Sequence, residues 1–398
     1  MSAYQVANRS IHTDDPGLSE ALAGIYGTKV RPLCLCRTPG IEMYIARFEG
    51  RHLVKRMPNS GVDHAPACDS YEPPSELSGL GQVIGSAIQP GPEEGITLLK
   101  FDFSLSKGAS RSAPAPSAKD GESAKTAGSR LSLRGTLHYL WEEAGFNRWA
   151  PAMAGKRSWY VIRKYLLQAA EDKMAKGVSL ARMLYIPESF SAEQKAEIAQ
   201  RRQGQLMQIT AAEKGARKLM LVIGEVKELA PSRYGHKIVL KHLPDCHFML
   251  NDDIYRRLIK RFEVELGLWD AMEGTHLLVI GTFGIGATGV ASFEEAALMC
   301  VTENWIPFES AYDKQVLDAA TQHGRRFLKG MRYNMPLTRP LACAVLSDTL
   351  PQPTALYVIP PGASHDFART VDSLIQESTL AHWVWRAGEV PQPELPSR

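Results

Sequence analysis

The chain has 398 residues, of which 44 % are hydrophobic and 22 % are charged, and its formal net charge is +3. These values are typical of a folded soluble protein with two or three domains, and so small a positive charge permits nucleic-acid binding without indicating it. The sequence has no run of about 18 apolar residues that would make a transmembrane helix, and its first residues lack the apolar core of a secretory leader. Six cysteines in so long a chain are no disulfide framework, so we expect a cytoplasmic protein.

Residues 1–104 alternate β-branched and aromatic residues with Gly and Pro, and this pattern predicts a β-rich module. Within the module, residues 43–56 read as two strands joined by a tight turn at Glu49-Gly50. Such a hairpin reverses the chain, so we expect the residues after it to lie beside the residues before it.

Four residues of the module are of the kinds that bind zinc: Cys34, Cys36, His64 and Cys68. A Cys-x-Cys pair on an extended strand puts both sulfurs on one face, and the hairpin would bring the second pair back to the first. Three thiolates and one imidazole fill a tetrahedral site and leave no position for water, so the set predicts a structural zinc ion. Two alternatives stay open, because the cysteines can be buried as small hydrophobes and His52 can compete as a ligand.

Residues 105–130 differ sharply in composition from what precedes them. From Ser106 to Ser129 there is no large apolar side chain, which predicts a flexible linker that proteases cut first. Residues 131–215 then predict a helical, helix-turn-helix-like region, with helices over 131–144, 158–176 and 191–208.

The second of these helices is predicted to have a basic face next to two tryptophans. Lysine and arginine contact phosphates, and aromatic rings stack on bases, so this face predicts nucleic-acid binding. The alternative is a solvated helix face over a core. The residues of this candidate site are Lys156, Arg157, Arg163, Lys164, Trp149 and Trp159.

Residues 216–398 alternate predicted strands and helices and indicate a mixed α/β domain. Strands are expected at 219–223, 237–241, 275–283, 342–346 and 354–359, and helices at 252–266, 312–323 and 365–377.

The end of this domain invites comparison with the restriction-endonuclease-like core, in which carboxylates on strands hold the metal ions that orient an attacking water. Weak catalytic candidates are Asp348, Glu303, Glu309 and Lys329. The strand at 355–359 has no Glu-x-Lys, so the metal lacks a ligand and the reaction lacks a charge stabiliser. We therefore expect no catalysis, with a degenerate nuclease as the alternative.

Two further patterns are weaker. Gly284-Ile-Gly-Ala-Thr-Gly289 follows a predicted strand as a dinucleotide-binding turn would, but no compact βαβ unit surrounds it, and close packing or a bulge is favoured. His236, His242, Cys246 and His247 form a loose cluster in which no second metal ion is expected.

Several segments resemble a known family. They are the Cys-Leu-Cys-Arg and His-Ala-Pro-Ala-Cys segments, Lys-Arg-Met-Pro-Asn-Ser-Gly at 55–61, Leu-Trp-Glu-Glu-Ala-Gly-Phe-Asn-Arg-Trp at 140–149 and Phe-Leu-Lys-Gly-Met-Arg-Tyr-Asn at 327–334. Over essentially its whole length the chain resembles an uncharacterised bacterial family, catalogued as domain of unknown function number eleven seventy-three. The resemblance implies a protein often encoded on integrative and conjugative elements and plasmids, and it supplies no activity. The ligand pattern is also distantly similar to a SWIM-type finger, with its second pair reversed and wider.

Taken together, the sequence predicts an α+β multidomain protein: a zinc-stabilised β module, a helical middle and a C-terminal α/β domain at 216–398. The favoured function is a non-catalytic, nucleic-acid-binding accessory protein of a mobile genetic element. The alternatives are a metal-dependent nuclease with a degenerate site and a protein–protein adaptor in conjugation. We expect the partner to be a nucleic acid, most naturally DNA, or another protein. We do not expect the protein to bind a membrane.

Overall fold

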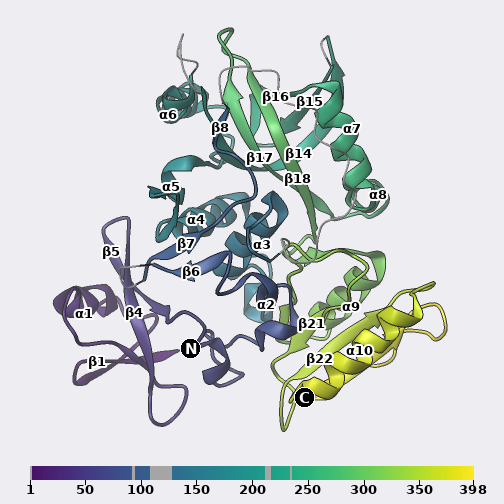
Figure 1. Ribbon diagram of the computed structural model, residues 1–398. Helices are drawn as coiled ribbons and strands as arrows, with labels where there is room; N and C mark the ends of the chain where they lie inside the picture. The colour runs from purple at the N-terminus through teal and green to yellow at the C-terminus, as the bar shows by residue number, and fades with distance from the viewer. Residues whose placement is uncertain (1, 92–94, 108–127, 211–216, 234) are drawn as a thin grey trace.

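The computed structural model of the protein describes residues 2–91, 95–107, 128–210, 217–233 and 235–398 (Figure 1). Most of the predicted linker lies outside these residues. Near its start, Ser106 and Lys107 form strand β8 (Ser106–Lys107), which pairs antiparallel with β13 (Arg217–Lys218).

The N-terminal part is a five-stranded sheet with the order β2-β1-β3-β4-β5. The predicted hairpin is confirmed: β4 and β5 pair antiparallel from Met43↔Arg56 to Phe48↔Arg51. Its turn residues Glu49 and Gly50 both have positive φ, which glycine adopts without strain. The elements are β1 (Ala3–Val6), β2 (Arg9–His12), α1 (Leu18–Ile25), β3 (Leu33–Cys34), β4 (Ile41–Phe48) and β5 (Arg51–Arg56).

The middle of the chain is built around helix α3 (Leu133–Glu143). Ser132 caps this helix by accepting a hydrogen bond from the Gly135 amide, and Gly145, with φ 74°, follows its end. Leu133, Leu137, Leu140 and Trp141 are buried and form an apolar stripe along this helix, which the sequence predicts over 131–144.

A four-stranded sheet with the order β11-β10-β7-β6 lies beside α3 and joins segments from both sides of the predicted linker. The predicted helix over 158–176 ends at Ala170, because the residues after it form β10, which pairs parallel with β7. The remaining elements of this part are η1 (Gly61–Asp63), η2 (Ser75–Leu77), α2 (Leu80–Val83), β6 (Ile88–Pro90), β7 (Thr97–Leu99), β9 (Arg148–Trp149), η3 (Pro151–Met153), α4 (Trp159–Ala170), β10 (Lys173–Ala175), β11 (Val178–Ser179), α5 (Leu180–Met183), β12 (Leu184–Tyr185), α6 (Lys195–Leu206) and η4 (Met207–Ile209).

Five strands of the next part close into a ring, at the top of Figure 1. Strand β14 pairs antiparallel with β17 through its first half and with β15 through its second half, and the register shifts between Val226 and Glu228. The ring continues from β15 to β16 and to β18, which is parallel to β16, and returns through the antiparallel pair β18–β17. The elements are β14 (Met220–Ser232), β15 (Gly235–Leu240), β16 (Leu243–Leu250), α7 (Asp252–Arg261), α8 (Glu263–Ala271), β17 (His276–Ile285), β18 (Ala291–Val301) and β19 (Pro307–Phe308). The predicted single helix over 252–266 is therefore two helices, α7 and α8, which meet at Phe262.

The C-terminal part is a sheet with the order β23-β22-β21-β20-β9, whose edge strand β9 comes from the middle of the chain. β20, β21 and β22 are antiparallel neighbours, whereas β22 and β23 run parallel. The elements are α9 (Ala311–Gln322), β20 (Phe327–Lys329), β21 (Ala344–Leu346), β22 (Thr354–Ile359), α10 (His365–Glu377) and β23 (Ala381–Arg386).

The predicted α+β fold class is confirmed in its coarse features, since the structure is a mixed α/β chain with several sheets and a Cys/His cluster near its N-terminus. One hydrophobic core extends from α2 and β6 through α3 and the ring of β14 to β18, here called the barrel, to β23. The N-terminal sheet has a smaller core of its own. Every helix in the described ranges is too short or too polar to cross a bilayer.

Gly330 tests how tightly the C-terminal sheet is packed. An alanine Cβ at this position would lie 2.1 Å from the carbonyl oxygen of Ala342, a backbone atom that cannot move aside. We expect Gly330→Ala to lower the free energy of unfolding by about 1–3 kcal/mol or more, measured by urea denaturation. The matched control is Gly204→Ala inside α6, where a Cβ meets nothing within 4 Å and alanine should stabilise the helix by about 0.5–1 kcal/mol. Equal urea midpoints for the two variants would contradict this account of Gly330.

Candidate metal centre

Cys34, Cys36, His64 and Cys68 come together in the N-terminal part, with their ligand atoms all within 4.8 Å of one another. Cys34 ends β3, and Cys36 follows in a turn rather than on the strand, so the predicted strand placement holds for the first cysteine only. His64 follows η1, and the amide of Cys68 donates to the carbonyl of Ala65 in the next turn. The two turns, not the strand pleat, aim the four side chains at one point.

Three of the six distances between the ligand atoms are close to the edges of a tetrahedral zinc site. Cys34 Sγ lies 3.6 Å from Cys68 Sγ, and His64 Nδ1 lies 3.3 Å from Cys36 Sγ and 3.7 Å from Cys68 Sγ. Zinc–sulfur bonds of about 2.3 Å and zinc–nitrogen bonds of about 2.0 Å in a tetrahedral site require edges of roughly 3.5–3.8 Å. The same sulfur separation is far too long for a disulfide, and the cysteines are free. The cluster could therefore hold a metal ion.

The surroundings of the cluster also suit a metal ion. Cys34 and His64 are fully buried and Cys68 is 7 % exposed, so water does not compete for their ligand atoms. The hydrogen bond from Cys34, with those from the Ser70 amide and from His64, lowers the pKa of the Cys68 thiol, although its burial acts the other way, and the same contact raises the pKa of Cys34. A thiolate is the form of cysteine that binds metals.

The alternative ligand, His52, does not belong to the cluster. It lies on β5, and its ring is 4.8 Å from the ring of Tyr26. The only group of potential ligands found among the described residues is the Cys34–Cys68 cluster.

A comparison with known protein families confirms the family resemblance described for the sequence. The model of the family described as "Protein of unknown function (DUF1173)" matches residues 4–388. The chain belongs to this family. No curated protein and no solved structure matches it significantly.

The candidate nucleic-acid site of this DUF1173 protein divides into buried and exposed residues. Trp149 and Trp159 are 2 % and 4 % exposed and belong to the core, so they cannot stack on bases as predicted. The Arg157 guanidinium donates to the carbonyls of Phe146, Asn304 and Arg148, and its burial lowers its pKa to about 10.

The other three residues of that site lie nearer the surface. Arg163 is half-buried and donates to the carbonyl of Ile186, whereas Lys156 and Lys164 are exposed. Tyr160, 64 % exposed one turn before Lys164, and Tyr165, 43 % exposed, are the large aromatic side chains that α4 exposes to solvent. The exposed residues of this face are therefore two lysines and two tyrosines, whereas Arg157 binds backbone carbonyls and Trp149 and Trp159 belong to the core.

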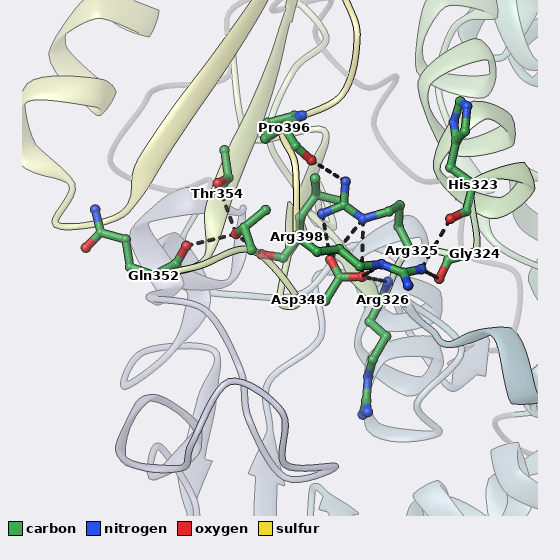
Figure 2. Close-up of polar contacts among 11 residues, drawn as sticks. His323, Gly324, Arg325, Arg326, Asp348, Gln352, Thr354, Pro396 and Arg398 are labelled. Carbon is green, nitrogen blue, oxygen red and sulfur yellow. Dashed lines mark hydrogen bonds and ion pairs between the residues drawn. The ribbon is translucent and has the colours of Figure 1, made fainter.

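The weak catalytic candidates do not converge on one point. Asp348 accepts hydrogen bonds from the side chain of Arg325 and from the Arg326 amide, and Arg398 lies 3.6 Å from it, as Figure 2 shows. Glu303 is exposed on the loop before β19. A carboxylate held by two arginines has no free oxygen to offer a metal ion.

Lys329 and Glu309 form a second, separate set. Lys329 Nζ is 3.2 Å from Asp313, and Glu309 pairs with Arg332 at 2.6 Å. Burial would raise the pKa of Glu309, but the charges of Arg332 and Lys329 lower it to about 2. Both residues are committed to internal ion pairs.

The two weaker patterns have structural explanations. The Gly284–Gly289 segment is the turn between β17 and β18, in which the Gly286 amide donates to Val290 and Gly289 to Gly286, and no helix begins there. In the histidine cluster, the ring of His236 stacks on Tyr255, and His242 lies 3.5 Å from Glu225.

Sequence reasoning missed a cavity of about 470 Å³ between the N-terminal part and α3. Its wall includes Arg56, Glu72, Glu142, Lys173 and Tyr333. Three of these residues lie in the segments at 55–61, 140–149 and 327–334 that carry the family resemblance. The adjacent carboxylates Glu142-Glu143 inside an otherwise buried helix were the signal that could have indicated it.

Substitution of Asp348 tests whether its ion pair with Arg325 is structural or catalytic. We expect Asp348→Asn to lower the free energy of unfolding by about 3 kcal/mol, because the buried guanidinium of Arg325 loses its countercharge. Urea denaturation measures this loss, and Glu303→Gln, on an exposed residue, serves as the control with little effect. A stable Asp348→Asn variant that abolishes Mg²⁺-dependent DNA cleavage by the wild-type protein would reverse the assignment.

Proposed function

We propose that this protein binds nucleic acid through the outer surface of its five-stranded barrel and uses a structural zinc ion to hold its N-terminal sheet. The observation that carries the proposal is the strand order β14-β15-β16-β18-β17, closed by the pair β14–β17. With a helical connection between its third and fourth strands and parallel third and fifth strands, this is the order of an OB-fold barrel. Such barrels bind oligonucleotides and oligosaccharides on the face of strands two and three, between the loops that follow strands one and four.

The corresponding face of this barrel is formed by β15 and β16. Ile238 and Phe248 are cross-strand partners and fully buried, so the adjacent pair of Lys237 and Met249 points outward. His247 is exposed on the same side of β16. A lysine beside an unbranched apolar side chain and an imidazole suits a phosphate next to an unstacked base.

The loop after the fourth strand is the glycine-rich turn at 286–290. Val290 is 44 % exposed where this turn meets β18, and the carbonyl of Lys218 lies near Gly284 at the other end of the turn. Lys218 therefore adds an exposed positive charge at the edge of the proposed face. A fold-level likeness alone does not assign function, and these side chains are what the proposal rests on.

The C-terminal sheet supports the same class of partner. Its order of elements, α9, three antiparallel strands, α10 and a strand parallel to the third, is that of the restriction-endonuclease-like core. Asp348 follows its second strand, where such cores carry a metal-binding aspartate, yet Arg325 and Arg398 occupy it. We propose a nuclease-like domain that serves binding and not cleavage, in an accessory protein of a mobile element as the family resemblance implies.

Reversing charges on the barrel face tests the binding proposal. We expect labelled single-stranded dT20 to bind in fluorescence anisotropy, with an affinity that falls steeply with salt. Lys218→Glu with Lys237→Glu should weaken binding at least tenfold and flatten the logarithmic salt slope by about 1.4, since each lost phosphate contact on a single strand removes roughly 0.7. Arg9→Glu with Lys29→Glu changes the charge equally on the N-terminal sheet and should leave binding intact.

A second pair of variants decides between the two basic surfaces. Lys156→Glu, just before α4, with Lys164→Glu on α4 should have little effect if the barrel binds. Loss of binding in this variant alone would move the site to α4. Absence of salt-sensitive affinity for dT20, single-stranded RNA and duplex DNA would reject nucleic-acid binding and leave the protein–protein adaptor.

The zinc proposal has its own test. We expect one equivalent of zinc per chain by inductively coupled plasma mass spectrometry, because three thiolates and one imidazole favour that ion. Cys68→Ser should lose the metal and destabilise the N-terminal sheet, since metal binding and local folding are coupled. Cys246→Ser, outside the cluster, is the control and should keep full zinc content. Metal-free wild-type protein of undiminished stability would overturn the proposal.

A further inference from the structure

The cavity between the N-terminal part and α3 has a charge pattern that the proposed function does not use. It is about 470 Å³ in volume, a size that suits a small organic ligand. Its wall combines apolar side chains, such as Leu80, Ile84 and Pro90, with carboxylates and tyrosines. A few oriented polar groups in an apolar wall are the usual form of a small-molecule site.

Two of the carboxylates in the wall are neutralised within the protein. Glu72 pairs with Arg56 at 2.5 Å, and Glu143 pairs with Lys173 at 2.8 Å. Lys173 is also 2.6 Å from Asp172, so its charge is already shared between two acids. These groups leave no positive charge free to hold an anionic ligand.

Glu142 is different, because no basic side chain lies within ion-pair distance of it among the described residues. Its carboxylate is held in place by the Tyr333 hydroxyl, which donates to Oε2 at 2.6 Å, and by the Asn147 amide, which donates to Oε1 at 3.3 Å. Each oxygen retains an acceptor position, and the side chain lines the cavity. A half-buried acid without a countercharge is a site that a cation would stabilise.

We propose that this cavity binds a small organic cation, an alkylamine or alkylguanidinium, with the carboxylate of Glu142 as its counter-ion. The apolar wall would cover the alkyl part, and the charged head would donate hydrogen bonds to Glu142. Anionic ligands, nucleotides among them, are excluded by the surplus of carboxylates at this wall.

The protonation of Glu142 gives the proposal a signature. Burial, with the negative charges of Glu72 and Glu143, raises the pKa of Glu142 to about 8, while the Tyr333 hydrogen bond and the charge of Arg56 oppose the rise. At pH 7 the acid is therefore mostly protonated, and a bound cation has to displace its proton. The affinity for the cation should increase about tenfold with each pH unit as the pH is raised toward 8, and it should level off above pH 8.

Butylguanidinium and the neutral, isosteric butylurea form the test pair. Isothermal titration of the wild-type protein should show saturable binding of butylguanidinium only, with release of about one proton at pH 7, measured from buffers of different ionisation enthalpy. Equal binding of both compounds, binding of neither, or binding without proton release would each overturn the proposal without any variant being needed.

Variants then locate the site. Glu142→Gln keeps the size of the side chain but removes its charge and replaces one acceptor oxygen by a donor, and it should weaken butylguanidinium binding about tenfold or more. Glu76→Gln removes an exposed charge at the same cavity and is the matched control, with affinity unchanged. If Glu142→Gln binds butylguanidinium as tightly as the wild-type protein, Glu142 is not the counter-ion. The zinc content of both variants confirms that the N-terminal part is intact.

Discussion

The charge of Lys173 is the constraint around which the centre of this molecule is arranged. Its ammonium group is almost fully buried, and an ion in such a place must be neutralised or lose its charge. Glu143 of α3 and Asp172 provide the countercharge, and Asp172 in turn accepts hydrogen bonds from Lys55 of β5 and Tyr44 of β4. The N-terminal sheet, the middle sheet and α3 are thereby fixed relative to one another by one chain of ion pairs.

Helix α3 extends this connection to the rest of the chain. The indole of Trp141 donates to the carbonyl of Trp305, next to the barrel, and Tyr333 of the C-terminal part donates to Glu142. Glu142 and Glu143 are neighbours on the helix but have opposite surroundings, since one faces a lysine and the other a hydroxyl and an amide. Because of this difference in partners, Glu143 forms a structural ion pair with Lys173, whereas Glu142 is a candidate ligand site.

Local patterns could be predicted from the sequence, and non-local pairings could not. The β4–β5 hairpin, the apolar stripe of α3 and the metal ligands depend on residues near one another in the chain. The closure of the barrel depends on β14 pairing with β17 and β16 with β18, and nothing in the strands themselves specifies these partners. Burial of Trp159 was predictable, because it has helical spacing with the buried residues Ile162 and Leu166. Arg157 was not, since it precedes the helix and is buried by carbonyls from distant segments.

The strand order also sets a sequence of events during synthesis. β9 can join its sheet only when β20 has been made, because Trp149 pairs with Phe327 and Arg148 with Leu328. All four candidate metal ligands, by contrast, lie between residues 34 and 68 and leave the ribosome early in synthesis. The N-terminal sheet can thus form, with its four candidate metal ligands together, while most of the protein is still untranslated, whereas the C-terminal sheet has to wait for β20 to β23.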